Sequence, residues 1–300
     1  MMTERGGLSP QNKGTVMRRS LIALWLIALM PNAFAQEFEL PTLRGSTPFV
    51  PAPPTYTRWS GVYVGGQVGN SSALVDFSRA TRSLVSFSLR ELALENVDHV
   101  SQWEVLGKPS VSGTNVGGFV GYNSQWDDLI LGVELNYTRG SLSAIAPVYP
   151  INRVAAAGGN VYSVDLTGSA SLHINDYATA RARAGWIVGN FMPFVTFGAA
   201  VGRADFSRSA TVSGTQNPFS PFDPTLCPSA AHPTCAQFSF PNSESKKGAL
   251  IYGWAAGGGA DVMILPHVFL RGEFEYVHFA PLSGIVAAIA SGRVGAGVQF

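Results

Sequence analysis

Few side chains in this sequence have the type and spacing that catalysis requires. His99 lies beside Asp98 and Ser101, the one local grouping of a base, an acid and a hydroxyl. A catalytic triad is defined by its geometry in space, so closeness along the chain does not create one. Glycine groups at 61–69 and 253–259 are not followed by the helix that a phosphate-binding loop needs. We therefore expect no enzymatic activity and no bound cofactor.

The two cysteines, Cys227 and Cys235, lie in a proline-rich stretch. If the chain is exported to an oxidising space, a disulfide between them is the expected state. The alternative is a metal site that includes His232. Two thiols and one imidazole leave the four-ligand shell of zinc incomplete, so we expect no metal there.

Eight charged residues in the predicted strands lie on the same strand face as glycines and other small residues. Asp261 alternates in phase with Gly257 and Gly259, and Arg293 with Gly295 and Gly297. The charged residues that obey this rule are Glu134, Arg181, Arg183, Asp261, Arg271, Glu273, Glu275 and Arg293. Four are basic and four acidic, and an isolated charge in a low-dielectric interior costs several kcal/mol. The pattern therefore predicts a buried network of ion pairs.

The elements that must position these charges are strands with a period of two. The predicted strands are 59–69, 115–125, 129–140, 171–188, 193–204, 250–264, 268–279 and 290–300. A soluble sandwich would place long polar side chains on its exposed face, whereas here the charged face is crowded with glycine. Eight strands close into a barrel whose interior is just wide enough for side chains. The sequence predicts an all-β fold, an eight-stranded antiparallel up-and-down transmembrane barrel.

The connections between the predicted strands alternate in length. The segments 70–114, 141–170 and 205–249 are long, and the turns between them are short. Outer-membrane barrels have short periplasmic turns and long external loops. We therefore expect both termini in the periplasm and the long loops outside the cell.

Composition agrees with a barrel and excludes a helical membrane bundle. The chain has 300 residues, of which 46% are hydrophobic and 13% charged, against an ordinary charged share of about 25%. The mean hydropathy is +0.16. The longest apolar run without charge, 21–30, is shorter than the roughly 20 residues of a spanning helix.

The first 35 residues have the organisation of a secretory signal. Met17 and two arginines precede the apolar run 21–30, and Ala33 and Ala35 form a cleavage site before Gln36. Met17 is the expected true start, because the residues before it are polar. The domain prediction is a signal at 1–35, a proline-rich periplasmic leader at 36–57, and a barrel at 58–300.

Removal of the signal also changes the charge balance. It takes four of the 20 basic residues and one of the 19 acidic ones, which leaves the mature chain slightly negative. Such a chain has no general attraction for nucleic acid.

Eight short motifs in order resemble the small porin-like surface antigens of alpha-proteobacterial outer membranes, barrels of the OmpA/OmpX type. The motifs begin at Trp59 (WSGVYVGG), Gly118 (GFVGYN), Gly132 (GVE), Thr179 (TARARAG), Pro193 (PFVTFG), Gly257 (GGGAD), Arg271 (RGEFEY) and Arg293 (RVGAGVQF). The resemblance implies a structural and surface-presentation role in the outer membrane of a Gram-negative bacterium, among its lipids and lipopolysaccharide. It also implies that Phe300 is part of the sorting signal that the barrel assembly machinery reads.

Three features depart from this resemblance. Phe119 stands where the family usually has a polar lumen residue, and Asp261 where glutamate is commoner. The loops 70–114 and 205–249 are longer than expected, and 80–98 is too apolar for a free coil. A helix, a hairpin or a partner-binding patch would each explain 80–98, and we expect this segment to fold against its own neighbours.

The role of the lumen and of the loops stays open at this point. The predicted charges favour a structural plug, and the alternative is a gated, narrow diffusion channel. Long loops can also carry binding, so an adhesin or ligand-binding surface protein is a further alternative.

Overall fold

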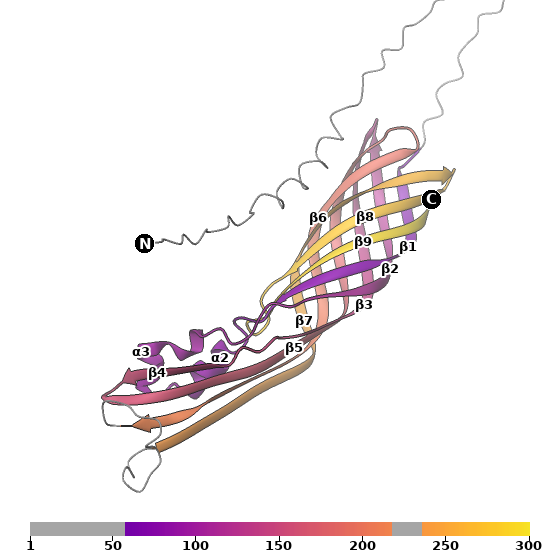
Figure 1. Ribbon diagram of the computed structural model, residues 1–300. Helices are drawn as coiled ribbons and strands as arrows, with labels where there is room; N and C mark the ends of the chain where they lie inside the picture. Colours follow the sequence, from indigo (N-terminus) through magenta and orange to yellow (C-terminus); the bar gives the residue numbers. More distant parts are fainter. Residues whose placement is uncertain (1–57, 218–235) are drawn as a thin grey trace, which may run out of the picture. The chain divides into compact units, whose positions relative to one another are not determined.

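The computed structural model describes residues 58–217 and 236–300, which belong to one folded unit (Figure 1). The strands are β1 (Gly61–Asp76), β2 (Ser110–Trp126), β3 (Leu129–Ile145), β4 (Ile151–Ala157), β5 (Asn160–Trp186), β6 (Phe191–Asn217), β7 (Ala236–Leu265), β8 (Val268–Phe279) and β9 (Val286–Gln299). The helical segments are α2 (Arg82–Ser88), α3 (Ala93–Asp98) and η1 (Val100–Gln102). Within these ranges no helix has the length and apolarity to cross a membrane. The predicted signal, leader and disulfide lie outside the described residues.

Eight of the strands form a closed ring. The sheet order is β3-β2-β1-β9-β8-β7-β6-β5-β4, every neighbouring pair is antiparallel, and an additional pairing of β3 with β5 closes it. β4 pairs with β5 alone, so it stands outside the ring. The predicted eight-stranded antiparallel barrel is confirmed.

Short connections gather at one end of the ring, which we call the turn end. β2 and β3 are joined by Asp127 and Asp128, and Asp127 adopts a positive φ of 51°, as tight hairpins require. Both ends of the barrel sequence meet here, since Phe300 N donates to Val62 O at 2.8 Å. The opposite end is called the extended end.

Beyond the extended end, the strands are longer than the sequence analysis predicted. β5 and β6 each have 27 residues and β7 has 30, and they stay paired as far as Val161 with Asn217. Much of 141–170 and 205–249 is therefore sheet and not loop. Many of its polar side chains are small serines and threonines, so their alternation with buried residues such as Val164 and Leu166 is weak in the sequence.

The segment 77–109 covers one face of this additional sheet. Leu84 and Val85 of α2, with Leu89 and Leu94, are buried in the same hydrophobic cluster as Val164, Leu166 and Val212. The prediction that 80–98 folds against its own neighbours is confirmed, and the structure it adopts is helical. We call α2, α3, η1, β4 and the strand parts 160–172, 206–217 and 236–248 the extension.

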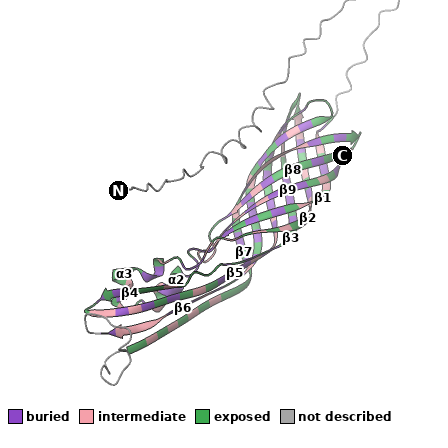
Figure 2. Ribbon diagram, viewed as in Figure 1, coloured by how far each residue is buried: buried purple, intermediate pink, exposed green. Residues whose placement is uncertain are grey.

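The outer wall of the ring is apolar. Buried and exposed residues alternate along its strands, as Figure 2 shows. The exposed side chains are large hydrophobics such as Val133, Leu135, Val195 and Phe197. From Leu129 to Tyr137, β3 climbs about 20 Å along the axis, at about 3.3 Å per residue and a tilt of about 40°. This height approaches the apolar band of about 25 Å that surrounds outer-membrane barrels.

Candidate functional site

The eight charged residues singled out in the sequence lie together inside the ring. All of them are buried, and the most exposed, Glu273, retains 5% of its accessible surface. They come from β3, β5, β7, β8 and β9, because the period of two turns alternate residues of each strand inward.

Arg181 of β5 binds three carboxylates of this network. Its guanidinium forms ion pairs with Glu134 and Glu273, and with Glu275 at 2.8 Å. A planar guanidinium presents five donors, which lets one arginine join three carboxylates from β3 and β8. Arg181 therefore links two sides of the ring.

Two arginines on the turn-end side share Asp261. Arg271 lies 2.9 Å from Asp261 and 2.6 Å from Glu134, and Arg183 lies 2.5 Å from Asp261. Because Glu134 is also bound by Arg181, these contacts join the two halves of the network. Tyr63 Oη donates a further hydrogen bond to Glu134 at 2.8 Å.

Arg293 completes the network toward the extended end. It lies 2.9 Å from Glu275 and 3.2 Å from Glu273, and it donates to Thr138 Oγ1 at 3.0 Å. The network contains four arginines and four carboxylates, so its formal charge is zero. Paired charges with additional hydrogen bonds offset the desolvation cost that isolated ions would have in this interior.

A layer of apolar side chains fills the lumen at the turn end. Its members form one buried cluster: Trp59, Tyr63, Phe119, Ile130, Ile187, Met192, Met263 and Phe269. Gly65 makes room for this layer, because a Cβ there would stand 2.2 Å from Phe119 Cζ. Arg271 stacks on Phe119, with 4.1 Å between the guanidinium carbon and the ring centroid.

The sequence analysis did not predict this apolar layer, although aromatic residues at lumen-facing positions indicate it. Phe269 and Phe119 occupy the same strand face as the glycines and charges, since Phe269 precedes Arg271 by two residues. Phe119 is a departure from the resemblance because it belongs to this apolar layer and not to the ionic one.

On the other side of the network the lumen is polar and then apolar again. Gln67 Nε2 donates to Asn136 Oδ1 at 3.0 Å, and the Ser71 and Ser291 hydroxyls lie 2.7 Å apart. Beyond them Tyr177 and Phe279 meet edge to face, with ring centroids 6.3 Å apart, at the start of the large cluster of the extension. The ionic network thus lies between two apolar layers.

His99, Asp98 and Ser101, the remaining catalytic candidates that the structure describes, do not form a catalytic site. The His99 side chain is exposed, and Ser101 Oγ donates to Glu95 at 2.5 Å and not to His99. Over 58–217 and 236–300, no three His, Cys, Asp or Glu residues are grouped so that they could hold a metal ion. The Phe300 side chain is 74% exposed at the turn end.

A closed ring of eight antiparallel strands with a charged lumen and an apolar outer wall defines the class of outer-membrane β-barrels. A family model described as the outer membrane protein beta-barrel domain matches residues 46–300, so the chain belongs to this family. Its location is therefore the outer membrane of a Gram-negative bacterium.

Solved structures of small outer-membrane proteins are similar to this chain at low sequence identity. The attachment invasion locus protein Ail of Yersinia pestis, solved with the heparin analogue sucrose octasulfate, is 14% identical, with 80% of this chain and 99% of that chain covered and a TM-score of 0.31. Neisserial surface protein A is also 14% identical, with 80% and 98% covered and a TM-score of 0.31. The comparison with curated proteins gave no match.

Proposed function

We propose that this barrel is a closed, structural outer-membrane protein that presents its extension at the cell surface. The observation that carries the proposal is the neutral ion-pair network held between two apolar layers of the lumen. Such a lumen offers no continuous polar path, whereas a channel needs sites that ions can enter and leave. The proposal includes no enzymatic activity, no cofactor, and membership of the alpha-proteobacterial surface-antigen branch.

The proposed orientation places the turn end in the periplasm and the extension outside. Short turns are the periplasmic side of single-chain barrels, and both ends of the barrel sequence lie at the turn end. The exposed Phe300 side chain is then available to the assembly machinery during biogenesis. The outer wall contacts outer-membrane lipid and lipopolysaccharide, and no nucleic-acid partner is proposed.

Ion conductance of the purified, folded chain in a planar bilayer tests the closed lumen. Folding is verified first: protein from the outer-membrane fraction should give a band whose electrophoretic mobility changes on boiling. We expect no stable conductance steps. Stable single-channel steps from heat-modifiable wild-type protein would overturn the proposal and favour the narrow diffusion channel.

A second candidate function, adhesion, is favoured by one face of the extension. The face opposite the helices bears in-register rows of small hydroxyls, such as Ser169, Ser209 and Ser243, and the first two hydroxyls lie 2.8 Å apart. An array of hydroxyls of this kind, with Asp165 as an exposed charge on the same face, fits the hydroxyls of a neutral polysaccharide.

Cells that display wild type or a variant of this protein on their surface are passed over dextran beads, and the fraction retained tests this second function. We expect Thr167→Lys with Thr211→Lys to abolish retention, and the exposed Arg90→Lys to leave it unchanged. Equal retention of the three strains, or none by wild type, would refute it.

A further inference from the structure

A groove with a floor of small side chains crosses the outer wall of the barrel. Two adjacent cross-strand rows form it, and the first contains Val120, Leu135, Ala180 and Ala199. The second row contains Gly118, Tyr137, Ala178, Val201 and Tyr252. The alanines and the glycine leave a depression between the larger side chains, with a volume of about 660 Å³.

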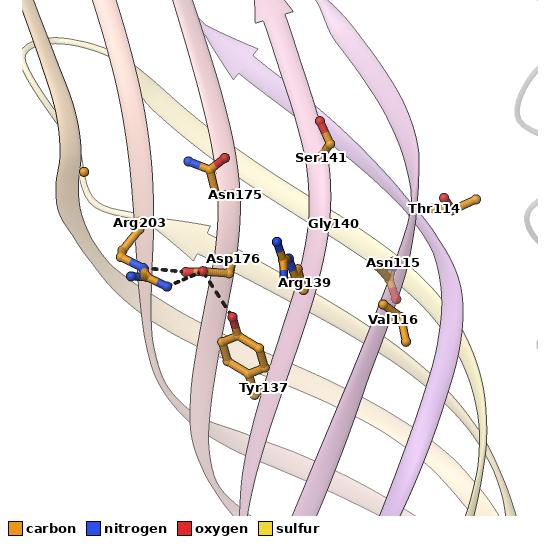
Figure 3. Close-up of a pocket in the computed structure, with 11 residues that line it drawn as sticks. Thr114, Asn115, Val116, Tyr137, Arg139, Gly140, Ser141, Asn175, Asp176 and Arg203 are labelled. Carbon is orange, nitrogen blue, oxygen red and sulfur yellow. Dashed lines mark hydrogen bonds and ion pairs between the residues drawn. The ribbon is translucent and has the colours of Figure 1, made fainter.

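The next row toward the extended end is charged. Arg139 of β3 pairs in register with Asp176 of β5, which pairs with Arg203 of β6. Figure 3 shows Arg203 and Tyr137 reaching Asp176 from opposite sides. These residues line a pocket of about 770 Å³. Tyr137 lines both the groove and the pocket, so the two cavities adjoin.

Irregular strand pairing opens this pocket. The register shifts between Arg139 and Leu142 in β3, between Ile174 and Asp176 in β5, and between Ala204 and Phe206 in β6. Bulges bend a strand and interrupt its ladder, and here they occur at one level of three adjacent strands. The wall therefore turns from barrel to extension directly above the charged row.

The charged row carries a net positive charge. Arg203 binds Asp176 through Nε at 3.0 Å and through a terminal nitrogen at 2.5 Å, and Tyr137 Oη donates to the same carboxylate at 3.1 Å. Arg139 is exposed, and no ion pair to it is found among residues 58–217 and 236–300. One guanidinium is thus committed to the carboxylate, and the other remains available to an anion.

We propose that this surface binds one lipid with a phosphate in its headgroup. An acyl chain lies across the floor made by Ala178 and Ala180, and the phosphate binds the available guanidinium of Arg139. Arginine pairs with phosphate through two parallel hydrogen bonds, and a charged head beside an apolar groove matches the boundary of a lipid leaflet. The inference rests on the proposed orientation, which makes this the outer leaflet.

Lipid binding to the full chain, folded in detergent, tests the proposal by native mass spectrometry with three probes. The probes are bis-phosphorylated lipid A, the same lipid after enzymatic dephosphorylation, and inorganic phosphate. We expect wild type to retain the phosphorylated lipid at least ten times more tightly than the dephosphorylated one. Inorganic phosphate should not bind, because it lacks the acyl chain.

Two pairs of variants separate the headgroup from the groove. Arg139→Gln, which removes no ion pair between described residues, should weaken binding at least five-fold, and the exposed Arg90→Gln should change it less than two-fold. Ala180→Leu fills the groove, and Ala182→Leu is its control two residues away on the same outer face. Ala180→Leu alone should lose the lipid.

The outcomes distinguish this inference from the proposed function. Equal retention of the two lipids, binding of inorganic phosphate alone, or wild-type affinity in Arg139→Gln would overturn the lipid site and leave the closed barrel standing. Conductance by wild type would overturn the closed lumen whether or not the lipid binds. Surface proteolysis that cleaves the turn end in intact cells would refute the orientation.

Discussion

Glu134 and Arg181 are cross-strand partners at the seam where the ring closes. Glu134 of β3 lies in register with Arg181 of β5, and their fully buried side chains form an ion pair. β4 lies between these strands in sequence but leaves the ring, so β3 and β5 meet without an intervening hairpin. The ion pair therefore joins two strands whose pairing no short turn enforces.

Loss of Arg181 should destabilise the barrel strongly. Arg181→Met leaves three carboxylates short of a partner, and breaking a buried pair costs about 3–5 kcal/mol. Urea unfolding followed by the heat-modifiable band measures this. The control, Arg203→Met, breaks an exposed pair worth less than about 1 kcal/mol. Similar midpoints for the two variants would show that the buried network does not stabilise the fold.

Opening the lumen should require changes in both the ionic and the apolar layer. Glu134→Ala alone is expected to stay silent in a planar bilayer, because Phe119 and Phe269 still close the turn end. Glu134→Ala combined with Phe119→Ala and Phe269→Ala at the turn end, and with Tyr177→Ala and Phe279→Ala in the other apolar layer, should conduct, provided that its band remains heat-modifiable. Conductance by the single variant would mean that the aromatic layer is no barrier.

Arg208 should hold the segment 77–98 against the sheet. Its guanidinium is buried and donates to Ala80 O at 2.7 Å and Ser283 O at 2.8 Å, and it forms an ion pair with Glu244. Arg208→Met should speed chymotrypsin cleavage at the exposed Phe87 about ten-fold. The exposed Arg82→Met is the control, and equal cleavage of both would contradict the role of Arg208.

Acidification should loosen the base of the extension. Burial of Asp76 opposes its ionisation, but hydrogen bonds from Lys108, at 2.9 Å, and from Ser78 outweigh it and hold the pKa of Asp76 below its usual value. A pKa lowered on folding gives stability that is present above the unfolded pKa of about 3.9 and is lost as pH falls through the folded value.

An acid protease measures this effect. Between pH 4 and pH 2, cleavage within 77–108 should rise more in wild type than in Asp76→Asn, which cannot titrate. Identical pH profiles for the two proteins would assign the loosening to other groups.

The sequence contained enough to predict the ring and its charges. Alternation over Leu270–Glu275 puts Arg271, Glu273 and Glu275 on one face. Because side chains of a strand alternate with a period of two, these three must all face inward or all face outward. Crowding of the charged face by glycine then indicated a narrow interior. These are local properties of each strand, so they survive without knowledge of its partners.

The layers of the lumen and the extent of the strands were decided by tertiary structure. Phe119 and Phe269 join one layer because of the register between β2, β1, β9 and β8, which no single strand encodes. The small hydroxyls of 160–172 and 206–217 carry a weak alternation, and helices packed on the opposite face make it a sheet. The sequence by itself determined which side chains face inward, and the pairing of distant strands determined which of them meet.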